Sequence, residues 1–211
     1  MAHQKYFFPL LNKNDNSLNN GFYKTLNNIE RSKKAHFLGY GNINKRASEI
    51  YALSPESIIC IRYGYILSQE IIDITRNGVF NIHSGILPNY RGILASFWSI
   101  LYNAKHLGLT LHKIIDHTID TGPILHTTKI VIHPKNSLLK QIIDMYELCI
   151  PKIWPVLYKG LIKKSVKLKT QNQDQANYYS YPVDQEVIKF LAKGYKLIDT
   201  EDYLKILERF V

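Results

Sequence analysis

Short apolar segments alternate with helical patterns along the middle of this chain, and that alternation restricts the fold more than any other feature of the sequence. Residues 57–62 are almost continuously apolar, which is typical of a strand buried on both faces of a parallel sheet. Similar patterns predict further strands over 79–83, 109–116 and 125–132. Helices are predicted over 44–53, 68–75, 94–103 and 138–160. Pro151 and Pro155 are expected to bend or break the last helix. The order predicts an α/β fold with a mainly parallel sheet flanked by helices.

The two ends of the chain differ from this middle part. Residues 12–28 contain seven Asn and are predicted to form a loop, and 35–38 are predicted to form a short strand. Later come a polar linker, an aromatic cluster and two short helices, predicted over 171–177, 178–182, 184–192 and 200–209. We therefore expect a main domain over 1–170, atypical at its N-terminal part, and a small C-terminal extension over 171–211.

Composition and charge restrict the class of protein further. No run reaches the roughly 18 apolar residues that a membrane span needs, and no signal peptide is recognisable, so we expect a cytoplasmic protein with no membrane partner. Cys60 and Cys149 lie among apolar residues and are expected to be buried free thiols. No CxxC or HExxH spacing is present, so no metal site is predicted. The net charge of +10 suits anionic partners, but no zinc finger or RNP-like pattern indicates nucleic acid.

Two polar residues end the strand that is predicted over 79–83. Asn81 and His83 are two positions apart, so on a strand both side chains project from the same face. A turn-rich segment with Pro88 and Gly92 follows, and a helical pattern begins after it. A strand end roofed by a loop is where α/β proteins place ligands and catalytic groups.

A carboxylate is the third member of the candidate site. Asp120 follows the strand predicted over 109–116 and precedes a Thr-Gly-Pro turn signal, from which it can face Asn81 and His83. These three residue types suit acyl-type transfer, because an amide N–H and an imidazolium N–H stabilise an oxyanion. Histidine titrates near the working pH and can take the proton of an attacking amine, while a carboxylate orients the imidazole and favours its charged form. No Ser or Cys nucleophile is needed if an amine attacks directly.

These segments together resemble the folate-dependent formyltransferase family, and most of all its nucleotide-sugar N-formyltransferases. The family carries Asn-x-His-x-Ser/Gly-x-Leu-Pro-x-Tyr/Phe-Arg-Gly, then a helix, a Gly-Val-Thr strand and an Asp-Thr/Ala-Gly-x-Ile-Leu turn. The matching residues are Asn81, His83, Leu87, Pro88, Tyr90, Arg91, Gly92, Gly108, Thr110, Asp120, Thr121, Gly122, Ile124 and Leu125. Residues 62–67 are similar to the family's Tyr-Gly-x-Ile-Leu segment, which closes the folate pocket. The resemblance covers residues 53–160 and implies a Rossmann-like sheet.

The resemblance implies a role for each matched residue. Asn81 and His83 would stabilise the oxyanion and handle the proton, and Asp120 would position His83 or a water. The co-substrate, N10-formyltetrahydrofolate, would meet Arg62, Tyr63, Gly64, Tyr65, Ile66, Leu67, His117, Thr118 and Ile119. The acceptor would meet Ser84, Gly85, Tyr90, Arg91 and Gly92, with Tyr90 and Arg91 facing its anionic part. His112 and His117 are each left open between a structural role and pocket lining.

The implied acceptor is the amine of a nucleotide-linked amino-dideoxysugar, such as dTDP-4-amino-4,6-dideoxyglucose, used for surface polysaccharides such as the O-antigen. The Tyr-Arg-Gly and Thr-Leu-His versions of the motifs favour this class over the transfer-RNA enzymes, whose large basic C-terminal domain would not fit into 171–211. Two alternatives stay open: formylation of another small amine such as glycinamide ribonucleotide, and a non-catalytic relative that binds folate or a nucleotide. The odd N-terminus favours the second alternative. The Tyr-rich segment over 178–182 is open between packing, a homodimer contact and a pocket wall.

Overall fold

A computed structural model of the chain describes residues 41–163 and 167–208. The loop predicted over 12–28 and the strand predicted over 35–38 lie outside the described residues. The chain divides into two compact units. Among the described residues, the larger unit consists of 42–133, 142–163 and 167–180, and the smaller unit includes 134–141 and 181–208.

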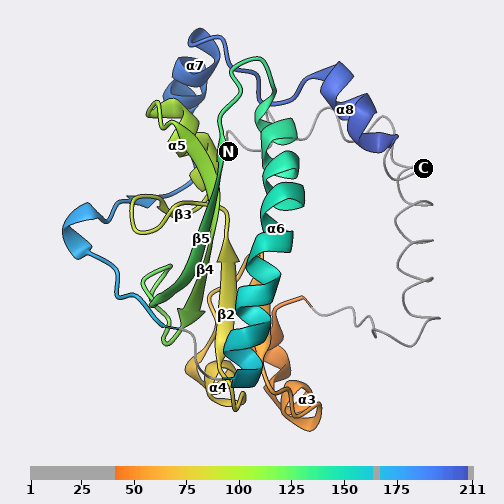
Figure 1. Ribbon diagram of the computed structural model, residues 1–211, viewed down its shortest axis with the longest axis vertical. Coiled ribbons are helices and arrows are strands. Elements are labelled where there is room, and N and C mark those ends of the chain that lie inside the picture. Colours follow the sequence, from red (N-terminus) through yellow and green to blue (C-terminus); the bar gives the residue numbers. More distant parts are fainter. Residues whose placement is uncertain (1–40, 164–166, 209–211) are drawn as a thin grey trace. The chain divides into compact units, whose positions relative to one another are not determined.

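A four-stranded sheet forms the centre of the larger unit (Figure 1). Its strands are β1 (Ile58–Ile61), β2 (Val79–His83), β4 (His106–Ile114) and β5 (Ile124–Val131). They lie in the spatial order β1-β2-β4-β5. The expected α/β class, with helices flanking a central sheet, is confirmed.

The direction of the strands differs from the expectation of a mainly parallel sheet. Among the described strands β1 pairs with β2 in parallel, whereas β2 with β4 and β4 with β5 are antiparallel. β4 and β5 are joined by 115–123, a connection short enough to reverse the chain directly, and such a reversal makes neighbours antiparallel. Apolar patterning reports the burial of a strand and not its direction, so the sequence could not distinguish the two arrangements.

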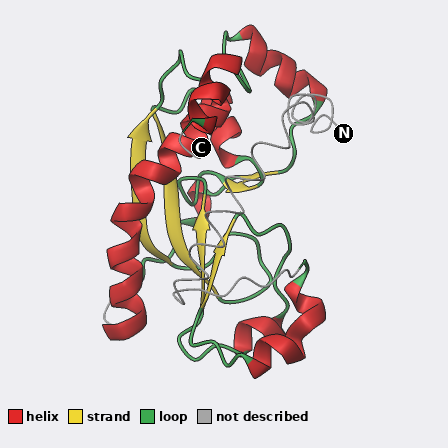
Figure 2. Cartoon of the chain, turned by 90° about the vertical axis from the view of Figure 1, so that its right-hand side faces the viewer, coloured by secondary structure: helices red, strands yellow, loops and turns green. Residues whose placement is uncertain are grey.

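Helices flank the sheet of the larger unit (Figures 1 and 2). They are the 3-10 helix η2 (Ile43–Arg46) and the α-helices α3 (Ala47–Ala52), α4 (Gln69–Asp73), α5 (Ala95–Leu101) and α6 (Leu138–Lys163). α6 runs along one face of the sheet and carries a fully buried stripe at i, i+4 spacing: Met145, Cys149, Ile153 and Leu157. Gly160 of α6 lines a cavity with Phe80 and Lys113, so α6 covers the face from which Phe80 projects. The side chains of Asn81 and His83 project from the opposite face.

The long helix is not interrupted by its prolines. α6 continues through both Pro151 and Pro155, so of the two expected effects, a bend or a break, the break does not occur. Its buried stripe extends on both sides of the prolines, from Met145 to Leu157. Burial of these apolar side chains holds both halves of the helix against the sheet and offsets the backbone hydrogen bonds that proline cannot make.

A second, smaller sheet brings a late part of the chain to the loop after β2. β3 (Arg91–Gly92) pairs in parallel with β6 (Tyr178–Tyr179). The 3-10 helix η3 (Gln173–Gln175) leads into β6. Residues of the predicted linker therefore pack inside the larger unit, beside the segment that carries the candidate site.

The smaller unit contains α7 (Asp184–Ala192) and α8 (Thr200–Leu207). α7 has the predicted bounds, and Gly194 follows it with a φ of +83°, as a glycine at a helix end commonly does. Ser137 N–H donates to Asp202 Oδ2 over 2.9 Å within this unit. In the described part of the chain, no helix combines the length and apolarity that a membrane crossing requires.

Candidate active site

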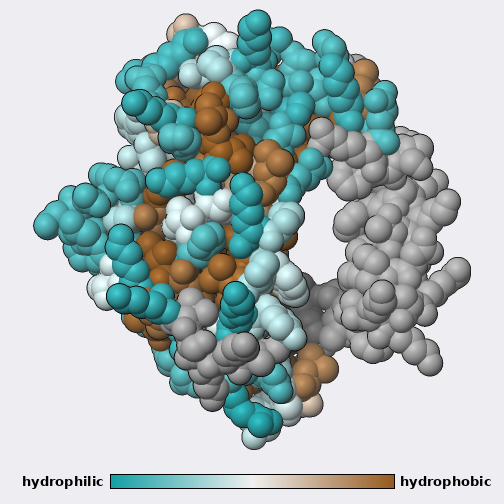
Figure 3. Space-filling view, viewed as in Figure 1, coloured by the Kyte–Doolittle hydropathy of each residue, from teal (hydrophilic) through white to brown (hydrophobic). Residues whose placement is uncertain are grey.

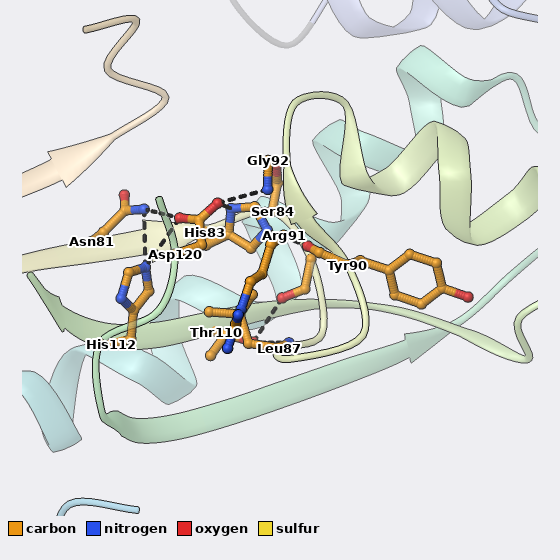
Figure 4. Close-up of polar contacts among 12 residues, drawn as sticks. Asn81, His83, Ser84, Leu87, Tyr90, Arg91, Gly92, Thr110, His112 and Asp120 are labelled. Atoms are coloured by element: carbon orange, nitrogen blue, oxygen red, sulfur yellow. Dashed lines mark hydrogen bonds and ion pairs between the residues drawn. The ribbon is translucent and has the colours of Figure 1, made fainter. Parts of the chain in front are cut away.

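Two neighbouring strands place four polar side chains on one face of the sheet. In the antiparallel β2–β4 pairing, Asn81 lies opposite His112 and His83 lies opposite Thr110. Directly opposed residues share a face, so all four side chains project together. Asn81 Nδ2 and His112 Nε2 are 3.2 Å apart (Figure 4).

Asp120 joins these side chains from the connection between β4 and β5. Its Oδ1 accepts from Asn81 Nδ2 over 3.2 Å and lies 3.3 Å from His112 Nε2. Its Oδ2 lies 3.4 Å from His83 Nδ1 and accepts the backbone N–H of Gly92 over 2.8 Å. The structure therefore brings the three predicted catalytic residues together around one carboxylate (Figure 4).

His112 belongs to this cluster, although the sequence left its role open. Its side chain is buried and contacts both Asn81 and Asp120. Its Nδ1 lies 3.3 Å from the carbonyl oxygen of Lys113, where a protonated Nδ1 can donate. Thr110 and His112 repeat the i, i+2 spacing of Asn81 and His83, which was the available signal in the sequence. Only the strand register shows that the two pairs face each other.

The environment of the carboxylate keeps it charged. Burial by itself would raise the pKa of Asp120, but the His112 hydrogen bond, the charges of His83 and His112, and the Gly92 N–H together lower that pKa below its ordinary value. Burial lowers the pKa of His83, and it outweighs the Asp120 charge and the Tyr90 carbonyl, which act in the opposite direction. The site therefore pairs an ionised carboxylate with an imidazole that is readily neutral.

Hydrogen bonds hold the loop that follows β2 against the cluster. His83 Nε2 lies 2.6 Å from the carbonyl oxygen of Tyr90, so this nitrogen carries the proton and donates. Thr110 Oγ1 donates to the carbonyl of Gly85 over 2.7 Å and accepts from Leu87 N–H over 3.2 Å. The loop is thus anchored to both strands that carry the cluster.

The predicted acceptor-binding residues point in different directions. The Tyr90 ring points away from Asp120 and stacks on Tyr179, with 5.8 Å between ring centroids (Figure 4). Arg91 is buried and donates to Gln171 Oε1 and Gln173 Oε1. Gly92 offers its N–H to Asp120. An acceptor-binding role for these residues stays a prediction.

A buried hydroxyl lies near another predicted contact of the acceptor. The hydroxyl oxygen of Tyr146, on α6, has no hydrogen-bond partner of acceptable geometry within the described residues. Burial raises its pKa, while the neighbouring Arg62 and Ser84 side chains act in the opposite direction. Tyr146 therefore adds an unsatisfied polar group beside residues that were expected to bind folate and acceptor, and no sequence pattern indicated it.

The two predicted folate segments are accessible to a ligand. Residues 62–66 follow the carboxyl end of β1 and are largely exposed, whereas Leu67 is buried. Tyr63 OH accepts from the backbone N–H of Ile43 over 2.9 Å, which ties this segment to η2. His117, Thr118 and Ile119 are exposed on the connection that leads to Asp120. Their folate contacts stay a prediction.

The described cluster offers hydrogen-bond donors and a base rather than a nucleophilic thiol. Cys60 and Cys149 are free and buried, and burial raises the pKa of Cys60 to about 11, so a reactive thiolate is disfavoured. Asn81 supplies amide N–H groups, and neutral His83 can accept a proton. These groups suit the attack of an external amine on an activated carbonyl carbon.

Comparisons with known proteins agree with this chemistry. A family model described as formyl transferase matches residues 41–144. A methionyl-tRNA formyltransferase of Clostridium tetani is 32% identical over 161 residues, covering 67% of this chain and 48% of that protein. This chain spans less than half the length of the methionyl-tRNA formyltransferases that it matches, for example 29%, 48% and 40% of three of them.

Solved structures share the fold at low sequence identity. The formyltransferase PseJ from Anoxybacillus kamchatkensis, in complex with UDP-4,6-dideoxy-4-formamido-L-AltNAc and tetrahydrofolate, gives a TM-score of 0.55 at 21% identity, over 67% of this chain and 73% of that one. A sugar N-formyltransferase from Shewanella sp. gives a TM-score of 0.57 at 16% identity, over 85% of each chain. At such identities these likenesses establish the fold alone.

Proposed function

Because a formyl transferase family model matches residues 41–144 and a methionyl-tRNA formyltransferase is 32% identical, we propose that this chain is a folate-dependent formyltransferase. On that premise we propose that it transfers a formyl group from N10-formyltetrahydrofolate to the amine of a nucleotide-linked amino-dideoxysugar. The observation that carries the proposal is the Asp120 carboxylate, which contacts Asn81, His83 and His112 at 3.2–3.4 Å in a largely buried site.

The proposed step needs no covalent enzyme intermediate. The acceptor nitrogen bonds to the formyl carbon, and the bond between that carbon and N10 of the folate then breaks. An amide N–H of Asn81 and the imidazolium form of His83 stabilise the oxyanion between these events. The proton lost by the amine passes through His83 to N10, and Asp120 stabilises the imidazolium while it exists.

Substrate binding has to release some of the contacts within the site. His83 Nε2 donates to the Tyr90 carbonyl, and Asn81 Nδ2 faces Asp120 and His112. We infer that the acceptor or the folate formyl group displaces the contact between His83 and Tyr90. A rearrangement of this kind is expected, because catalytic hydrogen bonds often form fully only in the complex with substrate.

Two observations support the sugar acceptor. PseJ, which was solved with a UDP-linked formamido sugar, and the sugar N-formyltransferase from Shewanella share the fold of this chain. The net charge of +10 also suits the diphosphate of a nucleotide sugar. Synthesis of surface polysaccharide such as O-antigen is the corresponding proposed role.

A second candidate acceptor is methionyl-tRNA. The curated relative from Clostridium tetani is a methionyl-tRNA formyltransferase, and a basic chain suits a polyanion as well as a nucleotide. Glycinamide ribonucleotide and a non-catalytic, ligand-binding role remain the further alternatives.

A formyl-transfer assay with N10-formyltetrahydrofolate tests the proposal. The acceptors are dTDP- and UDP-linked 3-amino and 4-amino dideoxysugars, glycinamide ribonucleotide and methionyl-tRNA. Turnover on one nucleotide sugar is expected, with loss in His83→Ala and retention in His126→Ala, a histidine of β5 that is outside the cluster. Turnover on methionyl-tRNA alone would replace the sugar proposal, and folate binding without any turnover would support the non-catalytic alternative.

A further inference from the structure

Gln171 is a buried side chain that hydrogen-bonds to two segments of the candidate site. It is 5% exposed, in a stretch whose sequence reads as a polar linker. We propose that Gln171 is a positioning residue that holds the Asp120 turn and the Arg91–Gly92 segment in register, so that the carboxylate faces His83. The inference rests on the proposed function of the site.

The amide nitrogen of Gln171 holds the backbone of the turn. Its Nε2 donates to the carbonyl oxygen of Asp120 over 2.8 Å and to that of Gly122 over 2.7 Å. Asp120 has a φ of +56°, in the left-handed region that non-glycine residues adopt at a cost. The two donated hydrogen bonds stabilise that conformation, and the conformation sets where the carboxylate points.

The amide oxygen of Gln171 holds the facing segment. Its Oε1 accepts from Arg91 Nε over 3.1 Å and from Arg91 Nη2 over 2.8 Å. Arg91 is followed by Gly92, whose N–H donates to Asp120 Oδ2 over 2.8 Å. Gln171, Asp120, Gly92 and Arg91 therefore form a closed ring of contacts, in which Gln171 fixes both the backbone and the partner of the carboxylate.

Gln173 provides a natural comparison two residues later. It donates nothing to the Asp120 turn in the described contacts, but its Oε1 accepts from Arg91 Nη1 over 3.1 Å. It is exposed and belongs to η3, a segment that is hydrophilic in the space-filling view (Figure 3). The same substitution at 171 or at 173 therefore alters the contact with Arg91. Only the substitution at 171 also alters the hydrogen bonds to the Asp120 turn.

The first test compares Gln171→Glu with Gln173→Glu. A carboxylate at either position still accepts from Arg91, but at 171 it cannot donate to the carbonyls of Asp120 and Gly122. We expect kcat of Gln171→Glu to fall about ten-fold or more with KM for the acceptor little changed, since small displacements of catalytic groups cost that much. Gln173→Glu should keep the wild-type kcat. Equal kcat values for wild type and both variants would overturn the proposal.

The second test does not depend on turnover. NMR titration of the His83 imidazole, assigned by its disappearance in His83→Gln, measures its pKa in Gln171→Met and in Gln173→Met. The Asp120 charge raises the pKa of His83, so a displaced carboxylate should lower that pKa in Gln171→Met. Gln173→Met should titrate as wild type does.

The two tests separate failure of this inference from failure of the proposed function. If no acceptor is formylated by the wild-type protein, the NMR comparison still decides the role of Gln171. If Gln171→Glu does not fold, the kcat comparison uses Gln171→Met against Gln173→Met. An unchanged pKa of His83 in folded Gln171→Met would overturn the proposal whatever the enzyme's substrate.

Discussion

Asp120 is a carboxylate in a buried setting that would disfavour its charge if hydrogen bonds and histidines did not surround it. Its pKa is lowered because His112, His83 and the Gly92 N–H together outweigh desolvation. An ionised Asp120 can then stabilise the imidazolium that His83 forms when it takes a proton. The residue thus links the electrostatics of the site to the proposed transfer step.

Replacement of that charge tests its role directly. Asp120→Asn should lower kcat by about 10²–10⁴, because His83 loses the partner of its charged form. One donor among Asn81, His112 and Gly92 would face an NH₂ group, which costs about 1–3 kcal/mol of unfolding free energy. Steady-state kinetics and urea denaturation measure the two effects, with the exposed Asp174→Asn as the control. A near-normal kcat would make Asp120 a structural turn residue.

His83 makes the stability of the fold depend on pH. Its folded-state pKa lies below the ordinary 6.5, chiefly because of burial, so the unfolded chain binds the proton first as the pH falls. The stabilising contribution is complete above about pH 6.5 and is lost as the pH falls through the lowered folded pKa. Urea denaturation at several pH values between the folded-state pKa and 6.5 measures this effect. The unfolding free energy of His83→Gln should fall less on acidification than that of wild type. Parallel curves for the two proteins would contradict this prediction.

At the scale of elements, the short β3–β6 pairing decides where the Gly92 N–H points. Gly92 has a φ of +92°, and a Cβ at this position would lie 2.1 Å from the carbonyl oxygen of Tyr179. Glycine is required here for both reasons. The pairing therefore couples the late residues of β6 to the hydrogen bond between Gly92 and Asp120.

Gly92→Ala should weaken both the pairing and the site. The positive φ alone costs about 1–2 kcal/mol for an L-residue, and the clash with Tyr179 adds to that cost and displaces the N–H from Asp120. Gly194→Ala is the matched control, since its φ is +83° but no atom lies within 4 Å of the added Cβ. Denaturation and formyl-transfer kinetics should show lost stability in both variants and lost kcat in Gly92→Ala. Equal kcat in the two variants would remove the β3–β6 pairing from the mechanism.

The prolines of α6 are a second property of an element. Pro151 is exposed and lies inside the helix, where it cannot donate the backbone hydrogen bond of that position. Pro151→Ala should raise the unfolding free energy by about 1–3 kcal/mol, the range expected when proline leaves a helix interior. Pro134→Ala, at an exposed position outside any helix, should give no such gain. A destabilised Pro151→Ala protein would contradict the expected cost of a proline inside this helix.

At the scale of the whole molecule, the excess of positive charge should act on binding. The chain carries 27 Lys and Arg against 17 Asp and Glu. Raising the ionic strength from about 0.01 M to about 0.15 M shortens the Debye length from about 30 Å to about 8 Å. KM for a nucleotide-linked aminosugar should rise over this range, whereas KM for the same aminosugar without its nucleotide diphosphate should change little. Equal salt dependence would argue against long-range attraction of the acceptor.

Local sequence determined much of this protein. The strand over 79–83 and the helix over 184–192 have the predicted bounds, and the helix predicted over 68–75 contains α4, whose N-cap Ser68 accepts from Ile71 N–H. Periodicity and capping act within a few residues, so they can be read without knowledge of the rest of the chain. The residue types at Asn81, His83 and Asp120 likewise indicated acyl-type transfer before any geometry was known.

Tertiary structure alone placed His112 and Gln171 at the site. The antiparallel register sets His112 opposite Asn81, and packing of the late chain buries Gln171 against the Asp120 turn. The same packing gives Arg91 two glutamine partners, which its motif did not indicate. Strand direction, register and long-range hydrogen bonds are fixed by burial of the whole core, because each depends on where every other element packs. Short sequence patterns carry no information on that arrangement.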